Sequence, residues 1–409
     1  MSIDTQIWKT FAAEHAPDFA RTVFLPGLVA DPGHLARLID DGLRTATRHA
    51  PGDLRLRAFR PGAFDYRLTK RFVDTPVADE ESAVDWLART ADGDEECLAV
   101  NDISSWNLDL AAEVARLVGE LVADGTHELP SGTDAYTFVA HSGWTPFGIH
   151  KDSEPSLIFH LGPSPKEVWV WHDNPFDASD ITPSPSFGRI TFDIEEHLAT
   201  AERHLLQPGD FLCIPRDTYH VFRNLGPSAF LGLTLYPAKT RALITEALWR
   251  AARPAGALAA YPAADEITDR ARTLLADDAD TPGAPLADRV AHEIALGQLR
   301  LRTNGYVSRP HPAALPRTAP APHAPLRWAR PGVVAAAPHH RGTTLVARGR
   351  TLIVPGPGPD DFTDLEKATA SDAPFTLEEL TAVLPDLLAP ERREEIALSL
   401  CGVGAVTAP

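Results

Sequence analysis

Short apolar runs follow one another closely between Asp134 and Pro237, and their spacing is the feature that most constrains the fold. Gly, Pro, Asp and Asn separate the runs, and these residues favour turns. In order the runs are DAYTFVAHSGWTPFGIH, SLIFHLG, EVWVW, GRITFDI, DFLCIP, HVFRNLG and AFLGLTLYP. Short alternating or apolar runs of this kind are typical of strands. The segment therefore predicts an antiparallel β-sandwich or β-barrel.

Helical periodicity flanks this β-rich segment on both sides. Upstream, we expect a hairpin over LRLRAFRPGAFDYRLTKRFV and helices over HLARLIDDGL, DEESAVDWLARTA and LDLAAEVARLVGELVADG. Downstream, helices are predicted over TRALITEALWRAAR, DEITDRARTLLADD and LADRVAHEIALGQLRLR. The sequence leaves open whether the downstream helices brace the β-rich core or pair with a second copy of the chain.

The remainder of the chain divides into a connector and a small module. Residues 308–340 are rich in Pro, Ala and His and predict an extended, semi-rigid linker, whose His residues we interpret as linker composition. Residues 341–409 predict a hairpin followed by short helices, the order of a winged-helix-like module, and Thr376 with Glu379 forms a capping-box pattern. The predicted division is 1–237 for the β-rich domain with its N-terminal helices, 238–307 for a helical region, 308–340 for the linker and 341–409 for the C-terminal domain.

Composition narrows the classes of protein that fit. The 409 residues carry a formal net charge of −18, which disfavours binding to a phosphate backbone. No apolar stretch is long enough to span a membrane, and the N-terminal residues lack the pattern of a signal peptide. The three cysteines, Cys97, Cys213 and Cys401, are not spaced like zinc ligands and do not suggest a disulfide framework. We therefore expect a reducing, cytoplasmic location.

One pair of polar residues interrupts the β-rich pattern. His150 and Asp152 lie at positions i and i+2, so on a regular strand both side chains project to one face and Lys151 to the other. His220, at the start of a later strand, is the best candidate for a third ligand. Two His and one carboxylate leave open coordination positions, the arrangement of non-haem Fe(II) oxygenases, whereas structural zinc usually has four closed ligands.

Such a pair is a weak signal alone, because the chain has 16 His and 56 acidic residues. A lysine strengthens the pattern: if SLIFHLG runs outward and KEVWVW runs back, Lys166 returns near the metal end of the sheet. A cation there can pair with a distal carboxylate of a ligand that chelates the metal. The alternative interpretation is a solvated lysine at the start of a strand.

These residues resemble the JmjC-type, cupin-fold 2-oxoglutarate oxygenases. HKD at His150 to Asp152, KEVW from Lys166 and PGDFLCIPRDTYH ending at His220 carry the resemblance. The order of the parts is similar to the bacterial ribosomal-oxygenase branch of protein hydroxylases. The resemblance implies a mainly β fold with added helices: a double-stranded β-helix (jelly-roll) core, N-terminal helices, a following helical region and a C-terminal winged-helix-like domain.

The resemblance also implies the cofactors and the role of each residue. His150, Asp152 and His220 would ligate Fe(II), Lys166 would bind the C5 carboxylate of 2-oxoglutarate, and Thr145 could add a hydroxyl to the same carboxylate. Fe(II), 2-oxoglutarate and O2 would together hydroxylate a C–H bond of a peptide or protein side chain, and a homodimer is implied. We match no residue of this chain to the substrate-side residues of these relatives, so the resemblance leaves the ribosomal-protein substrate open.

Several alternatives remain open at the level of sequence. The substrate could be a free or carrier-bound amino acid or natural product, or the chain could be a non-catalytic cupin-fold binding protein. Trp144, Trp169 and Trp171 are candidate walls of a dry cavity around the metal, although we expect at least two of them to fill the core. His141 and His160 are expected to be hydrogen-bonded core residues, and Asn224 and Thr234 to be satisfied buried polar groups.

Overall fold

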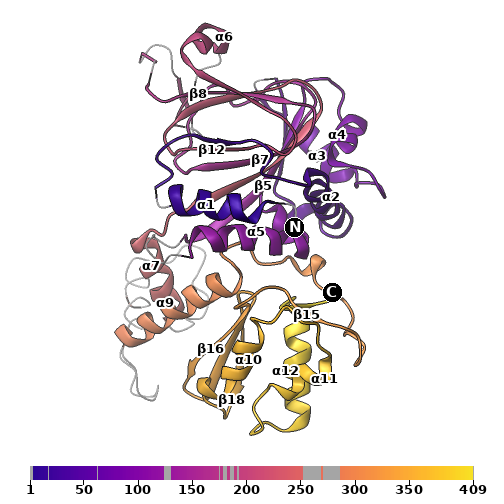
Figure 1. Cartoon of the computed structure of the whole chain (residues 1–409), viewed down its shortest axis with the longest axis vertical. Coiled ribbons are helices and arrows are strands. Elements are labelled where there is room, and N and C mark those ends of the chain that lie inside the picture. The colour runs from indigo at the N-terminus through magenta and orange to yellow at the C-terminus, as the bar shows by residue number, and fades with distance from the viewer. Residues whose placement is uncertain are drawn as a thin grey trace.

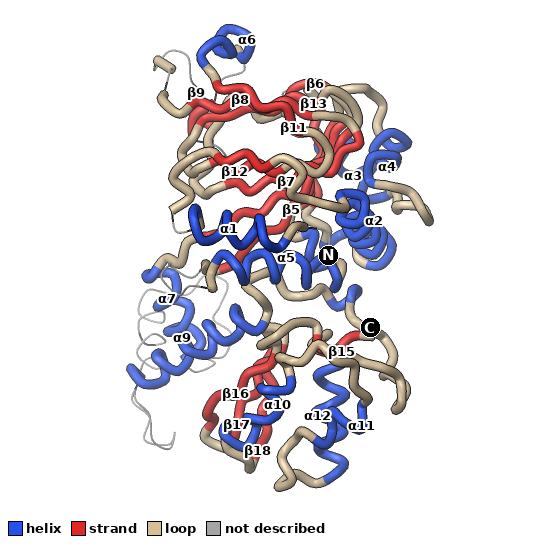
Figure 2. The backbone as a smooth tube through the Cα atoms, in the orientation of Figure 1, coloured by secondary structure: helices blue, strands red, loops and turns tan. Residues whose placement is uncertain are grey.

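The computed structural model describes residues 3–408 except 17, 62, 124–129, 175, 178–181, 185–187, 191–192, 252–268 and 270–285. Two antiparallel sheets stack as two layers in the N-terminal part, with helices below and beside them (Figures 1 and 2). A smaller module of strands and helices follows at the C-terminal end (Figure 1). The predicted helix over DEITDRARTLLADD lies outside the described residues except for Asp269.

The larger sheet has eight strands in the order β1-β12-β7-β14-β5-β4-β2-β3, all neighbours antiparallel. Four of them, β1 to β4, come from the region before Asp134 and extend the sheet beyond the predicted β-rich segment. The strands are β1 (Val23–Leu25), β12 (Phe211–Ile214), β7 (Ser156–Pro163), β14 (Ser228–Tyr236), β5 (Gly132–Ala140), β4 (Cys97–Val100), β2 (Leu56–Arg60) and β3 (Ala63–Phe64).

The smaller sheet has four strands in the order β11-β8-β13-β6. They are β11 (Glu202–Leu206), β8 (Lys166–Trp171), β13 (Tyr219–Asn224) and β6 (Gly143–Trp144). A separate two-stranded ribbon, β9 (Thr182–Ser184) with β10 (Gly188–Ile190), and the short helix α6 (Ile194–His197) occupy the segment between β8 and β11. The expected antiparallel β-rich core is therefore present.

The two sheets bury an apolar layer between them. Phe138, Ile158 and Phe230 from the larger sheet pack with Val168 and Phe222 from the smaller one. The opposite face of the larger sheet packs against helices through a larger cluster that includes Trp8, Leu43 and Leu117. Burial of this apolar surface on both faces is the main term that stabilises the layered arrangement.

Helices before the β-rich segment begin at residues suited to capping. They are α1 (Thr5–His15), α2 (Pro32–His49), α3 (Tyr66–Asp74), α4 (Ala83–Thr90) and α5 (Leu108–Leu121). The side chains of Asp31, Ser82 and Asn107 accept backbone N–H groups at the starts of α2, α4 and α5. Helices α1 and α5 lie side by side below the larger sheet (Figure 1).

The predicted hairpin over LRLRAFRPGAFDYRLTKRFV is only half right. Strands β2 and β3 do pair, but the second half of the segment forms helix α3. The side chain of Asp65 accepts the N–H of Leu68, and Leu68 and Phe72 are buried four residues apart on one helix face. The capping aspartate and this 3.6-residue periodicity outweigh the alternation that suggested a strand.

Beyond the β-rich segment, helices α7 (Thr240–Ala251) and α9 (Leu286–Thr303) pack against each other. The C-terminal module holds a three-stranded sheet of β16 (Val334–His339), β17 (Gly342–Ala347) and β18 (Arg350–Pro355). A ribbon of β15 (Arg327–Trp328) with β19 (Val406–Thr407) and helices α10 (Thr363–Ala368), α11 (Leu377–Ala382) and α12 (Pro390–Gly402) complete it. The capping box at Thr376 and Glu379 is confirmed.

The predicted linker is too long at its C-terminal end. Residues 326–339 contain β15 and β16, and Leu326, Trp328 and Val333 are buried in the core of the C-terminal module. These apolar side chains bury enough surface to fold a segment whose Pro and Ala content suggested an extended chain. The N-terminal part of the predicted linker is fixed to the layered sheets and their helices, because His311 stacks on Trp106 with ring centroids 4.0 Å apart.

Two further expectations concern the environment of the chain. Cys97, Cys213 and Cys401 are all buried thiols that form no disulfide. Among the helices that the structure describes, none has both the length and the apolar character needed to cross a bilayer.

Candidate metal centre

His150, Asp152 and His220 come together at one end of the layered sheets. Their ligand atoms all lie within 4.8 Å of one another. His220 is on β13, and His150 pairs with it through an isolated antiparallel bridge in which each backbone N–H donates to the carbonyl of the other residue. The two imidazole centroids are 4.5 Å apart, and Nε2 of His220 is 3.7 Å from Oδ2 of Asp152. The structure thus brings together the three residues that the sequence suggested as metal ligands.

Backbone carbonyls fix the tautomer of both imidazoles. Nδ1 of His150 is 3.0 Å from the Gly148 carbonyl, and Nδ1 of His220 is 2.9 Å from the Thr218 carbonyl. A carbonyl only accepts, so each Nδ1 carries the proton and each Nε2 is the nitrogen able to ligate a metal. Burial, followed by the charge of His150, lowers the pKa of His220 to about 4, which keeps the ring neutral at pH 7.

The carboxylate of Asp152 is oriented by a hydroxyl from the larger sheet. Ser156, the first residue of β7, donates its Oγ hydrogen to Oδ2 of Asp152 over 3.1 Å. Asp152 is only partly buried, whereas His150 and His220 are 4% and 2% exposed. The centre therefore has two buried imidazoles and one carboxylate at its more open side, and a metal held by these three ligands would keep positions free for a further ligand.

Lys166 is buried deep between the sheets, four strand positions along from the level of His220. In the pairing of β13 with β8, His220 is opposite Val170 and Asn224 is opposite Lys166. Four strand positions separate the two levels, about 13 Å at roughly 3.3 Å per residue. The backbone of Lys166 is therefore not level with the triad, but residues 166, 168 and 170 share the face that points between the sheets, and the long side chain can extend along that face. The approach of its ammonium group to the metal end stays a prediction.

The ammonium group of Lys166 is fully buried and lacks a hydrogen-bond partner within the described part of the chain. Three phenyl rings surround it, with Nζ 4.5 Å from the centroid of Phe230, 5.5 Å from Phe138 and 5.9 Å from Phe222. Burial lowers the pKa of Lys166 to about 7. An unpaired cation is costly to bury, so this site suits an anionic ligand.

Thr145 presents a second unused polar atom on the same inner face. Its N–H donates to the Phe222 carbonyl over 2.9 Å, which places it between the levels of His220 and Asn224 on β13. Its hydroxyl is buried, and no described group within reach bonds to it. Thr145 and Lys166 thus both offer a donor that the described residues leave unsatisfied.

The three candidate tryptophans do not line the space around the triad. Trp169 and Trp171 alternate with Val168 and Val170 along β8, so they point to the outer face of the smaller sheet. There they form a separate apolar cluster with Tyr219 and Phe176, and Trp144 packs against it. The expectation that at least two of the tryptophans fill a core is confirmed, and the cavity-wall interpretation is wrong for them.

Tyr136 is a residue of this region that the sequence reasoning missed. Its hydroxyl hydrogen-bonds Ser156 and Thr234, and burial followed by the charge of Asp152 raises its pKa. Gly232 makes room for the ring, because an ideal Cβ at position 232 would lie 2.2 Å from Cζ of Tyr136. Tyr136 and Phe138 stand two residues apart on one strand, and that alternation in DAYTFVA was the available signal.

Replacing Gly232 with alanine tests the placement of Tyr136. The added methyl group must displace the aromatic ring, so we expect Gly232→Ala to lower the free energy of unfolding by about 1–3 kcal/mol. Chemical denaturation measures this. Gly119→Ala is the control, since a Cβ there meets no atom within 4 Å and alanine favours a helix. A Gly232→Ala variant as stable as the wild type would contradict the placement.

The other candidate polar residues form local hydrogen bonds, as expected, although Nδ1 of His160 is buried without a partner among the described groups. His141 bonds through Nδ1 to the Gly93 carbonyl at 2.9 Å, and His160 through Nε2 to the Ser164 carbonyl at 2.8 Å. Asn224 donates to the Gly143 carbonyl and accepts from Ser228, and Thr234 bonds to Tyr136. Neither His141 nor His160 joins the cluster of possible metal ligands that His150, Asp152 and His220 form among the described residues.

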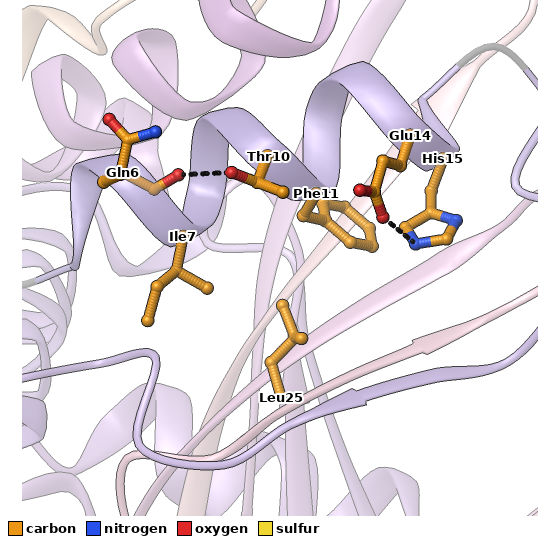
Figure 3. Close-up of a pocket in the computed structure, with 7 residues that line it drawn as sticks. All are labelled: Gln6, Ile7, Thr10, Phe11, Glu14, His15 and Leu25. Carbon is orange, nitrogen blue, oxygen red and sulfur yellow. Dashed lines mark hydrogen bonds and ion pairs between the residues drawn. The ribbon is translucent and has the colours of Figure 1, made fainter.

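A small pocket lies elsewhere, between α1 and β1, with a volume of about 200 Å³ (Figure 3). Its lining combines apolar side chains with a Glu14–His15 ion pair; the residues are Gln6, Ile7, Thr10, Phe11, Glu14, His15 and Leu25. No predicted site residue is among them, so this pocket is separate from the metal centre.

Comparison with solved structures identifies the overall architecture. A crystal structure of YcfD from Escherichia coli aligns over 100% of both chains with a TM-score of 0.51 and 16% sequence identity. The chain shares the fold of YcfD. A second structure of YcfD, described as a ribosomal oxygenase in complex with cobalt and 2-oxoglutarate, aligns over 98% of each chain with a TM-score of 0.50 and 15% identity. No protein-family model matches the sequence, and no curated protein matches it.

Proposed function

We propose that this chain is an Fe(II)- and 2-oxoglutarate-dependent dioxygenase that hydroxylates a C–H bond of a peptide or protein side chain. The observation that carries the proposal is the cluster of His150, Asp152 and His220 on the same inner surface as the unpaired cation of Lys166. Two imidazoles and one carboxylate suit Fe(II) with open positions. A buried ammonium suits the far carboxylate of a dicarboxylic ligand.

The residues present fit both groups chemically. Nε2 of each histidine and the carboxylate of Asp152 would hold the metal, and Lys166 with Thr145 would bind the C5 carboxylate of 2-oxoglutarate. When bound, iron and 2-oxoglutarate together supply the means to activate O2 for hydroxylation, with succinate and CO2 as co-products. The chain contributes orientation through Ser156 and exclusion of water through the phenyl rings around Lys166.

The architecture supports the proposal at the level of the fold. We assign the two stacked sheets as a double-stranded β-helix of the JmjC and cupin type, and residues 326–408 as a winged-helix-like domain. YcfD, which shares the fold, is described as a ribosomal oxygenase and was solved with cobalt and 2-oxoglutarate. From this similarity we propose that the substrate is a protein and that the chain belongs to the bacterial ribosomal-oxygenase branch. We also propose a cytoplasmic location.

Formation of succinate tests the class of substrate. The purified protein with Fe(II), 2-oxoglutarate and O2 is supplied in turn with free amino acids and with a peptide or ribosomal-protein mixture. Stimulation by the mixture alone supports a peptidyl hydroxylase. Stimulation by free amino acids alone would instead indicate that the chain tailors a small molecule.

A non-catalytic protein whose tail binds nucleic acid is the weaker alternative. On α12, Arg392 is paired with Glu395, and Arg393 is paired with Asp386. Both arginines of that helix are therefore neutralised by neighbouring carboxylates, which disfavours contact with a phosphate backbone.

Helix α7 is the proposed seam of a homodimer. Ile244 and Trp249 on this helix are 48% and 76% exposed, unusual values for large apolar side chains. We expect light scattering of the wild type to give the mass of a dimer and Trp249→Glu to give a monomer. A monomeric wild type at micromolar concentration would contradict the dimer, and Arg241→Glu at the start of the same helix is the control for added charge.

A further inference from the structure

A large cavity of about 1110 Å³ lies between the stacked sheets, helices α7 and α9 and the C-terminal module. The metal ligands do not line it, but one end is formed by their neighbours along the chain and the strands. Ser156, which bonds to Asp152, is paired with Thr234 on β14, and two residues further along β14 Tyr236 lines the cavity. Glu154, two residues after Asp152, lines the same end.

Arginines gather at the other end of the cavity. Arg300 comes from the end of α9, Arg309 from the segment that follows and Arg350 from the start of β18. They surround the tight turn at Gly349, because an ideal Cβ there would lie 3.1 Å from Cγ of Arg309 and 3.3 Å from the Arg300 carbonyl. This concentration of cations contrasts with the net charge of −18 of the whole chain.

Much of the hydrogen-bonding capacity of these arginines is unused. Nη1 of Arg300 and Nε of Arg350 are buried without a hydrogen-bond partner among the described residues. Arg300 forms a loose ion pair with Glu293, with Nη1 3.7 Å from its carboxylate, whereas Arg309 forms no ion pair with any described side chain. Arg350 donates only to the Pro310 carbonyl in the described part of the chain, at 3.3 Å. Buried guanidinium donors of this kind are suited to an oxyanion.

The C-terminal module is fixed against the rest of the chain, so the cavity has rigid walls. The buried guanidinium of Arg348 donates to the carbonyls of Gly404 and Leu108, and the N–H of Gly349 donates to the hydroxyl of Thr303 over 3.2 Å. These contacts join the β17–β18 turn to α5 and α9 on the far side of the cavity. A ligand there meets preformed donors rather than mobile loops.

We infer that this cavity binds the part of a polypeptide substrate that flanks the oxidised residue, and that Arg300, Arg309 and Arg350 bind an acidic side chain of that part. The inference rests on the proposed function, because the opposite end of the cavity is lined by Glu154 and Tyr236, which are close neighbours of Asp152 and Ser156 along the chain and the strands. The volume exceeds the needs of a single small anion. The charges of Glu154, Glu246 and Glu293 in the lining disfavour a polyanion such as a nucleic acid.

Binding of labelled peptides to the full-length protein tests the inference without iron. A fluorescein-labelled peptide that alternates Gly and Glu is compared with its Gly and Gln counterpart by fluorescence anisotropy at low ionic strength. We expect the Glu peptide to bind about tenfold more tightly, as charge-assisted hydrogen bonds to arginine would give. Arg309→Gln and Arg350→Gln should each remove most of this preference.

Arg302→Gln is the matched control, because Arg302 is an exposed arginine at the end of α9, close to Arg300 in sequence but outside the cavity lining. Arg309 is exposed too, so its variant tests the site even if Arg350→Gln folds poorly. Equal binding of the two peptides, or a preference that survives in Arg309→Gln and Arg350→Gln, would overturn the inference. So would arginine-dependent binding of inorganic phosphate or of single-stranded oligo-dT without binding of the Glu peptide. A failed oxygenase assay would leave this result unchanged, so the two failures are distinguishable.

Discussion

Lys166→Met is expected to abolish useful binding of 2-oxoglutarate while making the ligand-free protein more stable. The ammonium is fully buried among Phe138, Phe222 and Phe230 and has no hydrogen-bond partner in the described residues. Its removal relieves the cost of desolvating a charge, and a methionine of similar length fills the space. Loss of the ion pair with the ligand should raise the Kd for 2-oxoglutarate about 100-fold. Calorimetry measures the Kd, and denaturation measures the stability.

The pH dependence of stability separates these two effects. The folded-state pKa of Lys166 is about 7, below its ordinary value of 10.5. Between these values the unfolded chain binds more protons, so this lysine makes stability rise with pH from about 7 to 10.5. Lys166→Met should remove that contribution, whereas Lys9→Met, at an exposed lysine of α1, should leave both the Kd and the pH dependence unchanged. Unchanged affinity in Lys166→Met would exclude the assigned carboxylate site.

His220→Ala is expected to lower the 2-oxoglutarate-consuming activity by at least about 1000-fold. The substitution removes one of the bonds to the metal. Loss of a residue that only orients a metal ligand usually lowers metal affinity or activity about 10–100-fold, so loss of the ligand itself should have a larger effect. His220 is 2% exposed and its Nε2 faces Asp152, so no described side chain can replace it without moving the strand. Succinate formation under saturating Fe(II) measures the activity.

His172→Gln is the matched control for this loss. His172 is about half exposed and pairs with Glu202 away from the triad, so its variant should retain the wild-type activity. Circular dichroism verifies that His220→Ala is folded. A folded His220→Ala protein with wild-type activity would mean that the triad does not hold the metal.

Alternation along strands made much of the site predictable. His150 and Asp152 stand two residues apart, and the short apolar runs of residues 134–237 indicate strands by their spacing alone. His220 required a pairing between distant strands, which the order of the motifs suggested and the bridge between His150 and His220 provides. The three metal ligands could therefore be predicted from the sequence. Two of them follow from local alternation, and the third lies at the start of one further strand.

Register and face assignment were the parts that the sequence left undetermined. The position of Lys166 depends on which residue of β13 it pairs with, and Trp169 and Trp171 point outward because Lys166, Val168 and Val170 point inward. A shift of one residue would exchange these two sets, and no local signal in KEVWVW decides between them. Tyr136 was missed for a related reason, since its place depends on Gly232 in a strand almost a hundred residues later.

The most direct test of the oxygenase proposal is anaerobic spectroscopy of the purified protein with Fe(II) and 2-oxoglutarate. Chelation of the iron by the keto acid gives a visible metal-to-ligand charge-transfer band. We predict this band in the wild type and its loss in Asp152→Ala. Asp217→Asn is the control and should keep the band, because the wild-type Asp217 carboxylate pairs with Lys151. Absence of the band from a folded wild-type protein, or its persistence in Asp152→Ala, would contradict the assignment of His150, Asp152 and His220 as the iron ligands.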